Sequence, residues 1–177
     1  MAFDFSVENN PLFKEAQRLA IPPFNTLADI GCGLRPQTSI VAKQHTYVEP
    51  HSEYADIIQE KGHDVVRKTA LDFLSNCQDF DIITMFDVIE HMEKDEGKEV
   101  VNLVKEKARQ VFIFTPNGFM SQEETGDTDA WGFHGQKWQR HRSGWIPEDF
   151  PGWKVLTSPV CGSSFEGGTL LAVWTNE

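Results

Sequence analysis

The stretch Leu27–Pro36, LADIGCGLRP, decides how the rest of the sequence is interpreted. An apolar run ends in an acid, two glycines flank a cysteine, and a proline closes the segment. Glycine adopts backbone conformations with positive φ and has no Cβ. The pattern is therefore typical of a tight turn after a strand, or of a backbone that a ligand approaches closely.

A dinucleotide-binding turn carries the pattern G-x-G-x-x-G, and the third glycine is absent here because Arg35 and Pro36 occupy the places where it is expected. Glu49 ends the next apolar segment, HTYVEP. A carboxylate at the end of a second strand can accept hydrogen bonds from the hydroxyls of a ribose. The glycine turn and Glu49 together predict a nucleoside ligand with free ribose hydroxyls, and they disfavour an NAD-dependent oxidoreductase.

Apolar strand-like segments alternate with amphipathic helix-like segments along the chain. We expect strands at 26–31, 45–50, 63–68, 80–86 and 109–116, and helices at 10–20, 38–43, 52–62 and 95–108. Segments 153–158 and 169–176 are expected to form a closing pair of strands. This alternation predicts an α/β fold, a three-layer sandwich whose mostly parallel sheet is covered by helices on both faces, with one antiparallel strand.

Composition narrows the class of protein. The 177 residues fit one domain, 1–177, and no apolar run approaches the roughly 20 residues that span a bilayer. No basic region precedes an apolar one at the N-terminus, so no signal peptide is expected. The net charge of −11 disfavours binding to nucleic acid. The three cysteines form no CxxC pair, which predicts a reducing, cytoplasmic location and no zinc knuckle. The oligomeric state is not predicted by these features.

Five motifs follow one another in the order LADIGCG, YVEP, TALDFL, FDIITMFDVIEHM and QVFIFTPNG. Over residues 26–118 the sequence resembles class I S-adenosylmethionine-dependent methyltransferases. The resemblance implies a seven-stranded sheet with an antiparallel last strand, S-adenosylmethionine as cofactor and S-adenosylhomocysteine as product. The implied cofactor contacts are Asp29, Gly31, Cys32 and Gly33 at the methionine part, Glu49 at the ribose, and Phe86 and Asp87 beneath the sulfonium. The stretch Thr69–Phe73, with Leu71 and Asp72, would lie at the edge of the adenine.

Three polar residues follow the fourth expected strand. If a helical turn begins there, Asp87, Glu90 and His91 stand at i, i+3 and i+4 and share one face. His91 is a candidate base for an acceptor hydroxyl because its ordinary pKa lies near neutrality. The alternative is that His91 only caps or packs the turn.

Residues 116–147 form a lid-like insertion with little periodicity, and segments of that length are often functional. Tryptophans recur every seven residues, but several glycines disfavour a continuous helix, so we expect a loop with a short turn near 136–140. His141 is a second candidate for proton handling or acceptor positioning. Lys137, Arg140 and Arg142 predict a lid that holds an anionic or sugar-like substrate, and the alternative is a solvated loop anchored by its tryptophans.

The combined interpretation is a methyltransferase that acts on a hydroxyl of a small molecule or glycan, without a metal. An amine or a carboxylate is the alternative acceptor group. The segments FDVIEHM, HRSGW and EDF faintly resemble RNA 3′-terminal 2′-O-methyltransferases, in which two carboxylates and two histidines hold a divalent metal. In that alternative Asp87, Glu90, His91 and His141 would be the ligands. A further alternative is a non-catalytic module that binds S-adenosylmethionine and has lost turnover.

Overall fold

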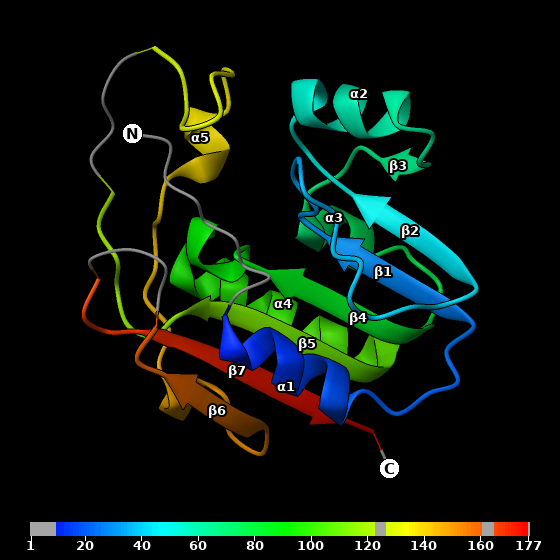
Figure 1. The fold of residues 1–177 in the computed structure, drawn as a ribbon, viewed down its shortest axis with the longest axis vertical. Coiled ribbons are helices and arrows are strands. Elements are labelled where there is room, and N and C mark those ends of the chain that lie inside the picture. Colours follow the sequence, from blue (N-terminus) through cyan, green and yellow to red (C-terminus); the bar gives the residue numbers. More distant parts are fainter. Residues whose placement is uncertain (1–9, 123–126, 161–164, 177) are drawn as a thin grey trace.

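The computed structural model describes residues 10–122, 127–160 and 165–176 (Figure 1). The strands are β1 Thr26–Ile30, β2 Gln44–Val48, β3 Val65–Val66, β4 Phe80–Phe86, β5 Ala108–Pro116, β6 Lys154–Ser158 and β7 Thr169–Thr175. The helices are α1 Pro11–Leu19, α2 Ser52–Glu60, α3 Ala70–Leu74, α4 Lys94–Lys107 and α5 Gln136–Gln139, with the 3-10 turns η2 Ile89–His91 and η3 Pro147–Asp149.

The strands form one seven-stranded sheet in the order β3-β2-β1-β4-β5-β7-β6. Strands β3, β2, β1, β4 and β5 pair in parallel, and β7 lies antiparallel between β5 and β6. The sequence correctly predicted the α/β class and the antiparallel last strand. The order of the connections changes direction between β1 and β4, and ligands of open α/β sheets bind beyond the strand ends at such a point.

Helices cover both faces of the sheet, and Figure 1 shows α1 and α4 on opposite sides of it. On one face α3 and α4 contribute buried residues such as Phe73, Val100 and Val104. On the other face α1 contributes Leu12 and Phe13 to a separate apolar cluster. These two clusters hold the sheet in place, so that the carboxyl ends of β1, β2 and β4 present their loops on the same side.

The helix expected at 38–43 is wrong, because residues 31–43 connect β1 to β2 without a helix. The side chain of Gln37 replaces helical hydrogen bonds: its Oε1 accepts from the amide of Ile40 at 3.0 Å, and its Nε2 donates to the carbonyl of Ile40 at 3.2 Å. The β-branched residues Ile40 and Val41 are poor helix formers. Ile40 is buried in the α1 cluster, so an irregular loop covers part of this face.

Between β5 and β6, the described residues 117–122 and 127–153 agree with the expected loop with a short turn, which the structure forms as α5. Cys32 is buried and Cys77 is half-buried, and both are free thiols, whereas Cys161 lies outside the described residues. Among the helices that the structure describes, none is long and apolar enough to cross a membrane.

Candidate active site

The glycine turn at the end of β1 requires glycine for two different reasons. Gly31 and Gly33 have φ values of 69° and 53°, a region that residues with a Cβ rarely adopt. A Cβ on Gly31 would lie 2.6 Å from Cγ2 of Val88, whereas a Cβ on Gly33 would meet nothing within 4 Å. Gly31 is therefore fixed by packing as well as by its backbone, while Gly33 leaves open space above the turn.

The carboxylate of Glu49 is tied to this turn. Its Oε2 accepts a hydrogen bond from the amide of Gly33 at 2.9 Å, and its Oε1 accepts one from the amide of His51 at 2.8 Å. Burial raises the pKa of Glu49, and the two amide hydrogen bonds act in the opposite direction. Each carboxylate oxygen has a second lone pair, so Glu49 can still accept hydrogen bonds from a ligand.

A cavity opens above the glycine turn, and its walls come from segments that are distant in sequence. Its lining residues are Ile30, Gly31, Gly33, Glu49, Pro50, Thr69, Ala70, Asp87, Val88, His91, Met92, Glu96, Lys137, Trp138, Gln139 and Arg142. The lining residues from Ile30 to Val88 lie at or directly after the carboxyl ends of the strands. The lining residues from Lys137 to Arg142 come from α5 and the segment after it, which form the opposite wall.

Of the residues expected to contact a cofactor, Gly31, Gly33, Glu49 and Asp87 line this cavity. Asp29 instead lies buried beneath the turn. Its Oδ1 accepts a hydrogen bond from Thr84 Oγ1 at 2.8 Å, and its Oδ2 accepts one from the amide of Gln37 at 2.9 Å. Asp29 thus holds the loop, and burial raises its pKa to about 7.

The other expected contacts lie outside the lining. The thiol of Cys32 is buried, and burial raises its pKa. Phe86 packs against Phe13 with ring centroids 4.8 Å apart. Neither Leu71 nor Asp72 lines the cavity; the preceding residues Thr69 and Ala70 do so in their place.

That replacement at 69–72 has a local cause. Thr69 caps α3, and its Oγ1 accepts a hydrogen bond from the amide of Asp72 at 3.2 Å. The cap sets the start of the helix at the cavity wall. The pattern T-x-x-D is a helix-start signal, and Thr69 is the first residue of the stretch that the resemblance assigned to the adenine edge.

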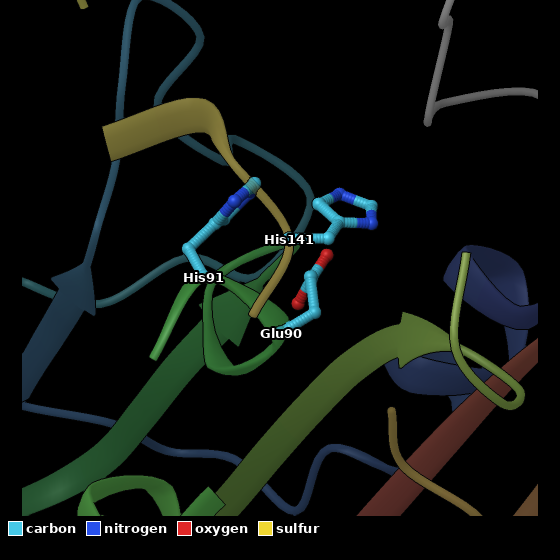
Figure 2. Close-up of side chains that lie close together, drawn as sticks. All are labelled: Glu90, His91 and His141. Atoms are coloured by element: carbon cyan, nitrogen blue, oxygen red, sulfur yellow. The ribbon is translucent and has the colours of Figure 1, made fainter. Parts of the chain in front are cut away.

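The second chemical feature is a cluster of Glu90, His91 and His141, whose potential ligand atoms all lie within 4.8 Å of one another (Figure 2). Glu90 and His91 come from η2, and His141 comes from the segment after α5. Oε2 of Glu90 accepts a hydrogen bond from Thr115 Oγ1 at 2.9 Å, while Oε1 is buried with no hydrogen-bond partner. An unpaired buried carboxylate oxygen is costly and marks a place where a ligand would be stabilised.

Each histidine of the cluster has one ring nitrogen next to a main-chain carbonyl. Nδ1 of His91 lies 3.3 Å from the carbonyl of Arg140, and Nδ1 of His141 lies 2.8 Å from the carbonyl of Met120. A carbonyl only accepts, so in each ring Nδ1 carries the proton and Nε2 carries the lone pair. Nε2 of His141 lies 3.0 Å from Nε2 of Gln122, whose amide can donate to it. Burial lowers the pKa of both histidines to about 4, so both rings are neutral at pH 7.

The two carboxyl groups beside these rings are also perturbed. Burial raises the pKa of Glu90 to about 7, although the hydrogen bond from Thr115 acts against this. Burial, followed by the negative charge of Glu90, raises the pKa of Asp87 well above its ordinary value. Asp87 also has a φ of 56°, which is strained for a residue with a side chain. Strain and perturbed carboxyl groups are typical of catalytic sites.

Main-chain hydrogen bonds bring His141 to η2. The carbonyl of Glu90 accepts from the amides of Arg142 and Ser143 at 2.8 and 3.1 Å. The indole Nε1 of the fully buried Trp145 donates to Ser143 Oγ at 2.9 Å and to the carbonyl of Ile89 at 3.3 Å. Ser143 and Trp145 therefore fix the position of His141. Sequence analysis missed Ser143, because no periodicity links this segment to η2.

The cluster fits a divalent cation in its chemistry. Metal-binding histidines generally donate one ring N–H to a carbonyl or carboxylate and bind the metal through the other nitrogen. His91 could do so as it stands, whereas a metal on Nε2 of His141 would have to displace the amide of Gln122. Neutral imidazoles and a carboxylate oxygen are suitable ligands. Asp87, the fourth expected ligand, does not belong to the cluster. The three residues would have to approach slightly, because ligand atoms around one metal are roughly 3–4 Å apart.

The sheet order, the antiparallel β7 and the glycine turn give the chain the class I S-adenosylmethionine-dependent methyltransferase fold. No protein-family model matches the chain, and no curated protein matches it in sequence. Its likeness to known proteins is therefore structural.

Three solved structures illustrate this likeness. N-methyltransferase NodS from Bradyrhizobium japonicum is 16% identical with a TM-score of 0.62, and the match covers 96% of this chain and 99% of that one. Small RNA methyltransferase HEN1 is 19% identical with a TM-score of 0.63, covering 94% of this chain and 25% of that one. The methyltransferase domain of the bacterial CtHen1-CN is 17% identical with a TM-score of 0.57, covering 93% and 94%.

Proposed function

We propose that this protein is an S-adenosylmethionine-dependent methyltransferase that acts on a hydroxyl group of a small-molecule or glycan acceptor. The observation that carries the proposal is the single cavity that joins Gly31, Gly33 and Glu49 to Asp87 and His91. The fold supports the choice of cofactor, since one structure of NodS is a complex with S-adenosylhomocysteine.

The cofactor half of the cavity is suited to each part of S-adenosylmethionine. The open space at Gly33 gives the methionine part room to approach the turn. Glu49 is positioned to accept hydrogen bonds from the ribose hydroxyls. Burial disfavours the ionised form of Asp87, and a positive sulfonium beside it would favour that form. The ionised carboxylate would in turn stabilise the sulfonium, and this attraction is lost in the neutral product.

Methyl transfer is an in-line displacement at the methyl carbon. A bond forms between the acceptor oxygen and that carbon as the carbon–sulfur bond breaks, and the electron pair of the broken bond goes to sulfur. The acceptor proton must leave, and Nε2 of His91 can accept it, because His91 lines the cavity and its ring is neutral at pH 7. His141 is buried beside His91 and does not line the cavity, so we assign it the positioning of His91. Much of the rate enhancement in such a reaction comes from alignment of the two reactants.

A second candidate is metal-assisted 2′-O-methylation of an RNA terminus, and the cluster geometry favours it. A conjugate-acid pKa of about 4 makes an isolated histidine a weak base for a hydroxyl group. A divalent cation held by Glu90, His91 and His141 would lower the pKa of the bound hydroxyl instead. The net charge of −11 opposes a polyanionic acceptor, so we place this candidate second.

The experiment that tests both candidates measures incorporation of labelled methyl groups from S-adenosylmethionine. The acceptors are small hydroxyl compounds, glycans and a short RNA with free terminal hydroxyls, each with EDTA, with Mg²⁺ and with Mn²⁺. Methylation of a small molecule or glycan that is insensitive to EDTA supports the first candidate. Methylation of RNA that EDTA abolishes and Mn²⁺ restores supports the second and contradicts the first.

A non-catalytic module is separated from both by the same assay. It would bind S-adenosylhomocysteine, and its variants His91→Ala and His141→Ala would keep this affinity, with no label transferred to any acceptor. An enzyme would instead transfer label and lose this activity at least about 100-fold in the same variants, because general acid–base groups contribute factors of this size.

A further inference from the structure

We propose that the acceptor is a small anion, whose phosphate or carboxylate group is bound by Lys137 and Arg142 while its ring lies against Trp138. This inference rests on the proposed function and specifies its substrate class. All three side chains line the cavity that also contains His91. They come from α5 and the segment that follows it, on the wall opposite the glycine turn.

The guanidinium of Arg142 is held against the main chain of α5. Nη2 of Arg142 donates a hydrogen bond to the carbonyl of Lys137 at 2.9 Å, and Nη1 of Arg142 lies 4.0 Å from Oε1 of Glu93. The hydrogen bond restrains the guanidinium of Arg142 next to α5, and its side chain is 32% exposed. Nζ of Lys137 lies 5.1 Å from the centre of the Trp138 ring. A restrained guanidinium is well suited to bind a phosphate or carboxylate through two parallel hydrogen bonds.

Charge explains why such cations would be needed. The chain carries 27 acidic and 16 basic residues, so a small anion is repelled by most of its surface. On the wall formed by α5 and the segment after it, Glu96 of the lining and Glu93, which lies 4.0 Å from Arg142, face the two cations, whereas Glu49 and Asp87 belong to the cofactor half. Lys137 and Arg142 are therefore the groups of this wall that can attract an anion.

The ring of Trp138 supplies the apolar part of the site. It is half-buried and lies in sequence directly after Lys137. An aromatic face beside a cation is well suited to a planar or sugar-like acceptor that carries a charge at one end. An acceptor anchored in this way would have a hydroxyl group within the cavity that His91 lines.

In the test, the protein is first saturated with S-adenosylhomocysteine. It is then titrated separately with three probes, which are inorganic phosphate, ribose 5-phosphate and uncharged ribose. Binding is followed by NMR on the indole N–H of Trp138, assigned with the variant Trp138→Phe. We expect ribose 5-phosphate and phosphate to shift this signal and ribose to leave it unchanged. Each of Lys137→Gln and Arg142→Gln should weaken the binding of ribose 5-phosphate about tenfold, since each removes a charge-assisted contact.

The matched control is Lys98→Gln, an exposed cation of α4 outside the cavity, which should leave probe binding unchanged. A wild-type protein that binds S-adenosylhomocysteine but neither anionic probe overturns this inference and leaves the proposed function standing. The inference is also overturned if Lys137→Gln and Arg142→Gln weaken the binding of S-adenosylhomocysteine but not that of the anionic probes, because the two cations would then bind the carboxylate of the cofactor. Binding of an oligoribonucleotide by a protein that does not bind ribose 5-phosphate would equally overturn the inference. Failure of S-adenosylhomocysteine to bind contradicts the proposed function itself.

Discussion

The imidazole rings of His91 and His141 lie edge to face with their centroids 4.8 Å apart. They come from two segments that are distant in sequence, and main-chain hydrogen bonds to the carbonyl of Glu90 hold those segments together. The site therefore depends on how well the segment containing His141 is anchored to α4 and η2. Trp145 provides that anchor, because its ring is fully buried and Nζ of Lys94 lies 3.8 Å from its centre.

Gly97→Ala should destabilise the protein. In an exposed helix interior this change stabilises by up to about 1 kcal/mol. In α4, however, the new Cβ would lie 2.4 Å from Cζ2 of Trp145, in a buried position. We expect the free energy of unfolding, measured with urea, to fall by about 1–3 kcal/mol.

The matched control for Gly97→Ala is Lys98→Ala, one residue further along α4 and exposed. It should change the free energy of unfolding by no more than about 0.5 kcal/mol. A gain in stability for Gly97→Ala would mean that Trp145 is not packed against α4 as described.

Asp129→Ala should loosen the segment that precedes α5. Oδ1 of Asp129 accepts hydrogen bonds from the amides of Trp131 and Phe133 at 2.8 and 3.0 Å, and Oδ2 accepts from Gly135 at 2.9 Å and from the hydroxyl of Tyr54. Without these acceptors, we expect the three amides to exchange hydrogen at least about tenfold faster, as local opening becomes easier.

Asp127→Ala, which removes a nearby exposed carboxylate, should leave the exchange of those amides unchanged. Equal protection in the two variants would contradict the role of Asp129. The affinity for S-adenosylhomocysteine should fall in Asp129→Ala alone, since α5 follows this segment directly and lines the cavity.

The pH dependence of stability should report on Asp29. Burial raises its pKa to about 7, so the folded state holds a proton that the unfolded state releases near pH 4. This stabilisation is complete below about pH 4 and is lost as the pH rises toward 7. The wild-type protein should therefore lose about 2–3 kcal/mol of unfolding free energy through Asp29 between about pH 5 and pH 8. The variant Asp29→Asn, whose amide resembles the protonated carboxyl group, should not show this loss. Parallel pH profiles for the two proteins would refute this assignment.

Glu49→Gln should weaken the binding of S-adenosylhomocysteine at least about tenfold, because it removes a charged acceptor for the ribose hydroxyls. The side-chain amide of glutamine has the same size as the carboxylate, and its one oxygen can still accept a hydrogen bond from the turn. Glu60→Gln, an exposed change at the end of α2, is the control and should have no effect on calorimetric affinity. Equal affinities would remove Glu49 from the site.

The sequence predicted those elements whose pattern has one physical interpretation. The continuous apolar run of β4 fits only a strand buried on both faces, and α4 has a clear helical period. The prediction was wrong at 38–43, where the tertiary contacts of Gln37 and Ile40 override local preference.

At the site, the glycine turn and Glu49 could be predicted because they are set by neighbouring strand ends. The placement of Asp29 beneath the turn could not, since an acid there can face either the ligand or the loop. The resemblance to RNA methyltransferases implies Asp87, Glu90, His91 and His141 as four metal ligands. The structure brings Glu90, His91 and His141 together without Asp87. Their approach depends on Ser143 and Trp145, which pattern reasoning cannot pair with η2.

The most direct test of cofactor binding is calorimetric titration of the protein with S-adenosylhomocysteine, with NAD as the control ligand. We expect one site per chain with a dissociation constant on the order of micromolar, corresponding to about −8 kcal/mol, and no heat of binding from NAD. Absence of binding by S-adenosylhomocysteine would mean that the cavity is not a cofactor site and that the turn at Gly31 and Gly33 is only a connection between strands.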